Sequence, residues 1–235
     1  EILQYAGTIA EAVDIAKKRK MFVSESFLIA SAADNRAVVI EKTPDDIDVY
    51  ESGKHEIMCA NHYQSHLLAG QELNQTQIKN SASLYRYQRL QQLMDGIKEN
   101  TPQQTAAILR DYHGKDNANI GLTNEKALNQ FISHHSVIFQ PQKLLVWVST
   151  SPWQLGEYVC YDLNNIFQSQ KPTPLYNASL NIAADSILHT TTFDQVNAYL
   201  DLEKKHLNHQ QVNAADIVRI NPLYYDSYRI AGDIY

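Results

Sequence analysis

Long apolar runs, long basic segments and closely spaced cysteines are all missing from this sequence of 235 residues. No apolar run approaches the roughly 18 residues that a membrane-spanning helix needs, so no membrane span is expected. The formal net charge is −6 and no long block of lysine and arginine occurs, which makes nucleic acid an unexpected partner. The two cysteines, Cys59 and Cys160, lie far apart without CxxC spacing, which argues against a disulfide framework or a structural zinc site.

The remaining composition is that of a globular protein. Hydrophobic residues make up 44% and charged residues 20% of the chain, and the length suffices for one large or two small domains. The sequence opens at Glu1 without a methionine or a signal peptide, and it stops at Tyr235 within an apolar pattern. We therefore expect an excerpt of a longer protein. No pattern calls for a cofactor, and the compartment stays unknown.

The first sixty residues predict one helix and a group of strands. Thr8 and Glu11 have the spacing of a capping box, and apolar residues then recur at helical spacing, which predicts a helix over about residues 8 to 20. Four short apolar or β-branched runs separated by turns follow, and they predict an antiparallel meander with strands at 25–30, 37–41, 47–50 and 57–60.

The rest of the chain repeats this alternation and ends in helices. Helical spacing returns after Ser81, and Thr101-Pro102 predicts a second helix start. A second group of strands is expected at 136–139, 143–149 and 157–161. Helices outside two layered sheets, an α+β arrangement, fit this order.

The C-terminal third is expected to be organised differently. We expect a polar, irregular linker over 164–191, which includes the segment Lys-Pro-Thr-Pro at 171–174, and helices over 192–235. Residues 212–235 resemble one helix–turn–helix piece of a tetratricopeptide-type repeat. Two ordinary packed helices would give the same pattern.

Asn61 and His62 are the first candidates for chemistry. They follow an apolar run predicted to be a strand, and sites are often built where strands end. The asparagine amide can donate to an oxyanion, and the histidine can orient a partner or act as acid or base. Alternatively, Asn61 satisfies a turn and His62 lies on the surface. Cys59 is flanked by apolar residues, which favours a buried structural thiol over a nucleophile.

Two arginines form the second candidate group. The spacing places Arg86 on the same helix face as Leu90, and Arg89 lies close by. A charge on a core-facing stripe requires a partner, so Arg86 either orders a site or forms a structural salt bridge with an acid such as Glu41. The pair His134-His135 is poorly placed for a metal, because neighbours on a strand point to opposite faces.

Several stretches together resemble one known family, the acyl-coenzyme A:6-aminopenicillanic acid acyltransferase (isopenicillin N acyltransferase-like) family. The similarity covers roughly residues 1 to 163. In order, the stretches are residues 35–44 (NRAVVIEKTP), Asn61-His62, residues 83–90 (SLYRYQRL), residues 108–111 (ILRD) and the strand group 136–139, 146–147 and 158–163.

This resemblance implies an N-terminal-nucleophile (Ntn) hydrolase fold, an αββα sandwich, of which residues 1–163 would be the C-terminal part. In such enzymes a precursor cleaves itself before a cysteine, which then attacks an amide or thioester carbonyl with its own α-amine as base. The resemblance makes Asn61 the oxyanion donor. It makes Arg86, with His62 and Arg89, a candidate for ordering the site or binding substrate.

The resemblance also implies a gap. Neither Cys59 nor Cys160 matches the family's nucleophile, which lies upstream of the Asn-His turn. We therefore expect a portion of an amidohydrolase or acyltransferase that is inactive alone, whose partners are a small acylated substrate and a missing N-terminal portion of the same protein. The alternative is a non-catalytic binding or scaffold module whose helical tail binds a partner.

Overall fold

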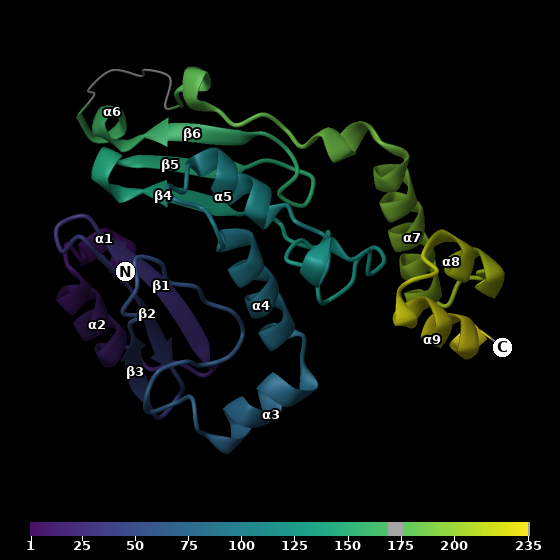
Figure 1. Cartoon of the computed structure of the whole chain (residues 1–235), viewed down its shortest axis with the longest axis horizontal. Coiled ribbons are helices and arrows are strands. Elements are labelled where there is room, and N and C mark those ends of the chain that lie inside the picture. Colours follow the sequence, from purple (N-terminus) through teal and green to yellow (C-terminus); the bar gives the residue numbers. More distant parts are fainter. Residues whose placement is uncertain (169–175, 235) are drawn as a thin grey trace. The chain divides into compact units, whose positions relative to one another are not determined.

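The computed structural model describes residues 1–168 and 176–234, and the chain divides into two compact units (Figure 1). The first unit comprises Glu1–Gln91 and Pro141–Lys143, and the second comprises Gln92–Gln140 and Leu144–Tyr235. Each unit contains one three-stranded antiparallel sheet, and the C-terminal region is helical. The predicted α+β class and the helical tail are therefore confirmed. The proposed domain limits at 163 and 191 stay predictions.

The first unit begins with two helices and a meander. Its elements are α1 (Ile2–Tyr5), α2 (Ile9–Lys18), β1 (Glu25–Ser31), β2 (Arg36–Lys42) and β3 (Ile47–Tyr50), with the sheet order β1-β2-β3. The predicted capping box is present: the side chain of Thr8 accepts from the backbone N–H of Glu11, and the Glu11 carboxylate accepts from that of Thr8. This explains why the first long helix begins where the sequence predicts.

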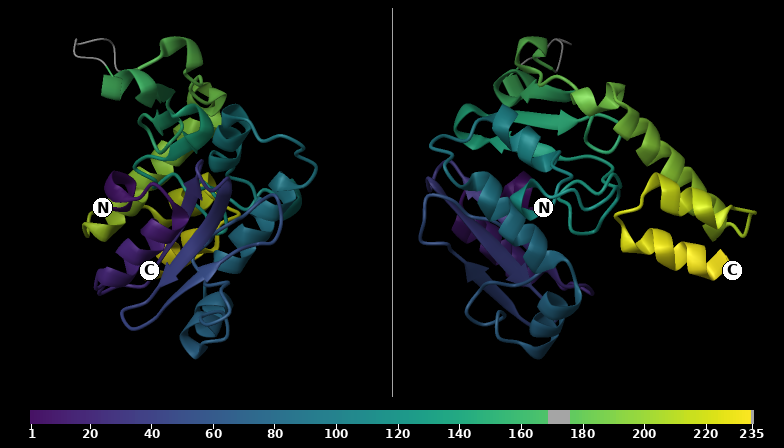
Figure 2. Two further views of the ribbon diagram at one scale, coloured as in Figure 1. Left: turned by 90° about the vertical axis from the view of Figure 1, so that its left-hand side faces the viewer. Right: turned by 45° about the vertical axis from the view of Figure 1, so that its right-hand side comes forward.

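The two faces of β2 make different contacts. Val38 and Ile40 join a buried cluster with Ile9 and Ala12 of α2. Figure 2 shows α2 lying along one face of this sheet. The alternation of a strand turns Glu41 to the other face. Glu41 is fully buried there, beneath the loop that follows β3.

The fourth predicted strand is wrong. Residues 57–60, all of them in the described part of the chain, form no strand and belong to the loop that leads to α3 (Glu72–Asn80) and α4 (Ser83–Met94). Side chains meet the carbonyl groups of this loop: Gln64 donates to Met58, and Ser52 donates to Glu56. The apolar character of the run reflects partial burial, not pairing with a strand.

The second unit has its own core. Its sheet has the order β4-β5-β6, with β4 at Val137–Gln140, β5 at Leu145–Ser149 and β6 at Tyr158–Asp162, which confirms the second predicted strand group. A 3-10 turn at Pro141–Lys143 joins β4 to β5. The helix α5 (Pro102–Leu109) begins with a capping box at Thr101 and buries Ala106 against Trp147 and Cys160.

The tail continues this unit. Its elements are α6 (Leu163–Gln168), 3-10 turns at Ala178–Leu180 and Ser186–His189, α7 (Thr191–Leu207), α8 (Ala214–Ile220) and α9 (Tyr225–Ile234). Val196 of α7 packs with Phe131 and Leu155, whereas Tyr199 of the same helix packs with Ile217 and Ile230. The predicted linker segment 171–174 lies outside the described residues, and the repeat-like character of the tail stays a prediction. Within the described ranges, no helix combines the length and apolar character of a membrane span.

Candidate functional site

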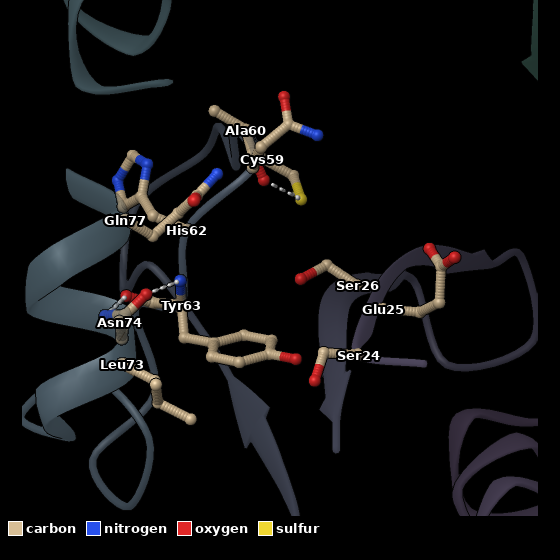
Figure 3. A pocket seen from close by; sticks show the side chains of 11 residues that line it. Ser24, Glu25, Ser26, Cys59, Ala60, His62, Tyr63, Leu73, Asn74 and Gln77 are labelled. Atoms are coloured by element: carbon tan, nitrogen blue, oxygen red, sulfur yellow. Dashed lines mark hydrogen bonds between the residues drawn. The ribbon is translucent and has the colours of Figure 1, made fainter. Parts of the chain in front are cut away.

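The Asn61-His62 turn lines a pocket of about 550 Å³ in the first unit (Figure 3). Eleven residues surround it, from the start of β1, from the loop after β3 and from α3: Ser24, Glu25, Ser26, Cys59, Ala60, Asn61, His62, Tyr63, Leu73, Asn74 and Gln77. Most of them are polar and uncharged. The structure therefore brings the two sequence candidates of the turn into one cavity.

A buried asparagine fixes the loop beside the turn. Asn74 of α3 accepts from the backbone N–H of Tyr63 at 2.8 Å and donates to the carbonyl oxygen of Tyr63 at 3.1 Å and to that of Ala69 at 2.9 Å. The two bonds to Tyr63 imitate the pairing of two backbone segments. Together they hold the chain one residue after His62.

Asn61 has a defined amide orientation. Its side-chain oxygen accepts from the guanidinium of Arg86 on α4 at 2.5 Å. An arginine can only donate, so the oxygen of the amide faces Arg86 and its NH₂ group points elsewhere. Asn61 is exposed and lines the pocket, which means that a donor is held at the surface of a cavity.

His62 is buried and neutral near physiological pH. Its Nδ1 lies 2.8 Å from the hydroxyl of Ser83, and its ring meets that of Tyr87 edge-on at 5.5 Å. Burial lowers the pKa of His62, Arg86 acts in the same direction, and the Glu41 carboxylate opposes them. The interpretation of His62 as a surface residue is thereby excluded, and the Ser83 hydroxyl fixes the orientation of its ring.

Neither cysteine has the properties of an activated nucleophile. Cys59 is partly buried at the pocket wall, and burial raises the pKa of its thiol, with the Glu41 charge adding to the effect and the Ser26 hydrogen bond opposing it. Cys160 is fully buried in the second unit, and burial raises its thiol pKa too. A thiol with a raised pKa is mostly protonated near neutral pH and reacts slowly.

The two arginines of α4 occupy different environments. The spacing predicts Arg86 on the buried face, but the structure leaves Arg86 half-buried and buries Arg89, which is 3% exposed. The helix is turned so that its buried positions are Ser83 and Arg89. Of the two, Arg86 has the contact to the pocket residue Asn61.

The histidine pair His134-His135 is exposed. Among the residues that the structure describes, no group of three or more histidine, cysteine, aspartate or glutamate side chains is arranged to hold a metal ion.

Sequence reasoning missed the residues that support the turn. Asn74 sits in a polar helix and gives no local signal, because its partner Tyr63 is 11 residues away. Glu41 did give a signal, since it is an acid within the β-branched run of β2. Its carboxylate accepts from the backbone N–H groups of Gln64 and Ser65 at 2.8 and 2.9 Å.

Comparison with known proteins identifies the family of this chain. No curated protein and no solved structure matches this chain. The model of the family described as acyl-coenzyme A:6-aminopenicillanic acid acyl-transferase matches residues 1–151, which is well over half of the chain and includes the Asn61-His62 turn and α4. The chain therefore belongs to the acyl-coenzyme A:6-aminopenicillanic acid acyl-transferase family.

Proposed function

We propose that this chain is part of a cysteine Ntn-type amidohydrolase or acyltransferase and that the pocket at Asn61 stabilises the oxyanion of its acyl-transfer reaction. The observation that carries the proposal is the amide of Asn61, whose oxygen is bound by Arg86 and whose NH₂ group remains to donate at a pocket surface. A fixed donor that acts where negative charge develops is among the larger contributions to acyl transfer. In this scheme Arg86 orients Asn61, and His62 and Arg89 support the same helix and turn.

The nucleophile is proposed to come from a cysteine outside residues 1–235. Two observations support this: Cys59 and Cys160 are partly or fully buried, and burial raises the pKa of both thiols. The thiol of the incoming cysteine passes its proton to its own α-amine, and the thiolate adds to the carbonyl carbon of an amide or thioester. The displaced electron pair forms the oxyanion, which Asn61 stabilises. When the C=O double bond forms again, the bond from the carbonyl carbon to the leaving nitrogen or sulfur breaks. The leaving amine or thiol takes the proton from the α-amine. The acyl group remains on the cysteine sulfur, from which it is transferred to water or to an amine.

The test uses the full-length protein. Intact-mass spectrometry should show self-cleavage directly before a cysteine, and incubation with small amide and thioester substrates should release the acyl group after an acyl-enzyme intermediate. Full-length protein that is folded, uncleaved and unreactive toward both substrate types contradicts the enzymatic proposal. That outcome favours the second candidate, a non-catalytic binding module.

A further inference from the structure

Two carboxylates of the sheet hold the loop that carries Asn61. Glu41 on β2 accepts from the N–H groups of Gln64 and Ser65, and Asp48 on β3 accepts from the N–H group of Leu67 at 2.8 Å. The two acids lie directly opposite each other in the antiparallel register of β2 and β3. They therefore present adjacent carboxylates to one short stretch of backbone.

The opposed pair Glu41 and Asp48 does not favour the stability of the sheet. Like charges opposite each other on neighbouring strands destabilise a sheet, and a fully buried carboxylate requires several donors. Glu41 receives two backbone donors from residues only two and three positions after His62. The geometry couples a rigid strand directly to the turn. The neighbouring buried positions of the strand are the apolar Val38, Val39 and Ile40, and the charged Lys42.

Glu41 also sits among the side chains of the site. Its charge acts on the ionisation of Cys59, His62 and Tyr63, which all line the pocket. The neighbouring Lys42 does not neutralise it directly, because its ammonium donates to the carbonyl oxygen of Ala16 at 2.5 Å beneath α2. The carboxylate of Glu41 is thus directed to the loop.

We propose that Glu41 is a positioning residue of the acyl-transfer site: through the N–H groups of Gln64 and Ser65 it fixes the turn so that the Asn61 amide meets the oxyanion. The inference rests on the proposed function, but its structural part can be measured without any turnover. Asp48 belongs to the same anchoring pair and acts further along the loop, at Leu67, so that its effect on Asn61 is weaker.

The experiment compares Glu41→Gln, Glu41→Asp and Asp48→Asn in the full-length protein. Glu41→Gln keeps the size of the side chain but replaces one accepting oxygen with an NH₂ group. Glu41→Asp keeps the charge but withdraws it from the loop. Because small displacements of a catalytic group are costly in rate, both Glu41 variants should lower kcat roughly tenfold or more with little change in KM, and Asp48→Asn should lower it less.

Titration of Cys59 separates charge from position. The pH profile for alkylation of Cys59 should move to lower pH in Glu41→Gln, because a neighbouring negative charge is removed, and should stay in place in Asp48→Asn. Wild-type kcat in Glu41→Asp would mean that only the charge of Glu41 matters, and not the position of its carboxylate. Wild-type kcat in Glu41→Gln would mean that the carboxylate does not contribute. Either result would overturn the proposal.

A readout without turnover distinguishes failure of this inference from failure of the proposed function. Hydrogen exchange at the amides of Gln64 and Ser65 should accelerate in both Glu41 variants, and the NMR signal of the Asn61 side-chain amide should shift relative to the wild-type protein. If the wild-type protein has no activity and these changes occur, the proposed function fails while the anchoring role stands. Unchanged exchange and an unchanged Asn61 signal overturn the inference. Glu41→Asp remains informative if Glu41→Gln does not fold.

Discussion

Two loops of this protein, one in each unit, are fixed by the same device. In the first unit Asn74 pairs with the backbone N–H and carbonyl of Tyr63, and in the second Asn221 pairs with those of Leu122, both bonds there being 2.9 Å. Both asparagines are buried, at 5% and 1% exposure. Each asparagine side chain thus satisfies the backbone N–H and the carbonyl of one loop residue, as a paired strand would.

The two loops differ in what they present. The loop held by Asn74 carries Asn61, whose amide is exposed at a pocket and oriented by Arg86. The second loop is joined by Asn221 to the helical tail across 99 residues of sequence, and the amide of Asn221, like that of Asn74, is used in holding its loop. A rigid loop is therefore no sign of chemistry by itself. The distinguishing feature is the side-chain NH₂ group of Asn61, which Arg86 orients through the amide oxygen and which faces a pocket.

The largest expected effect is on Asn61. Asn61→Asp retains an acceptor for Arg86 but removes the NH₂ donor, so kcat should fall about 100- to 1000-fold with little loss of stability. Asn61→Ala should have a similar kcat. Steady-state kinetics and urea unfolding of the full-length protein measure both quantities. Wild-type kcat in Asn61→Asp would show that Asn61 donates nothing to the transition state.

Replacement of Asn74 or Asn221 should lower stability in both cases but activity in only one. Asn74→Ala and Asn221→Ala each leave a backbone N–H and a backbone carbonyl without partners, which costs about 3 kcal/mol of unfolding free energy in the unit concerned. Only Asn74→Ala should also lower kcat. Both tryptophans, Trp147 and Trp153, lie in the second unit, so their fluorescence in a urea titration reports that unit.

The matched control is Asn208→Ala, an exposed asparagine at the end of α7, which should change unfolding by less than about 0.5 kcal/mol. If Asn221→Ala lowers kcat as strongly as Asn74→Ala, the distinction between the two loops does not hold.

The sequence predicts elements well where the signal is local. Capping boxes at Thr8 and Thr101 mark helix starts, and both strand groups have the expected β-branched runs. The resemblance to the family singles out Asn61 as a candidate, and the structure shows that Asn61 lines a pocket, whereas the strand expected at 57–60 is a loop.

The roles of the asparagines are not predictable in this way. Asn61, Asn74 and Asn221 are the same residue type, and their roles depend on partners 25, 11 and 99 residues away. The burial of Arg89 instead of Arg86 depends on how α4 is turned about its axis, because residues three positions apart are separated by only roughly 60° around a helix.

Gly121 lies directly beside Asn221 in the second unit. Its φ is +84°, and a Cβ there would lie 2.8 Å from Oδ1 of Asn221 and 2.9 Å from the backbone nitrogen of Tyr224. Gly121→Ala should cost about 2 kcal/mol of unfolding free energy, from the left-handed backbone and from displacement of the Asn221 bonds.

The control is Gly53→Ala in the first unit. It has a similar φ of +65° but open space around it, so it reports the backbone strain alone. Equal losses in the two variants would mean that close approach to Asn221 contributes nothing. The double variant Gly121→Ala, Asn221→Ala should be less destabilised than the sum, because both changes damage the same contact.

The smallest expected effect is a pH response of opposite sign in the two units. Burial lowers the pKa of His62 below its usual 6.5, so the unfolded state takes up the proton first, and the first unit should lose stability as the pH falls below about 6.5. Burial, with Asp226 adding to it, raises the pKa of Glu203 in the tail above its usual 4.5, while Tyr199 and Arg229 oppose the shift. The folded tail therefore binds that proton first, and its stability should rise as the pH falls toward 4.5.

Hydrogen exchange by mass spectrometry at about pH 7 and about pH 5, corrected for intrinsic rates, resolves the two units. His62→Gln should remove the response of the first unit only. If both units respond in the same direction in wild-type protein and in His62→Gln, groups other than these two govern the acid response, and the neutral, buried state assigned to His62 beside Asn61 is wrong.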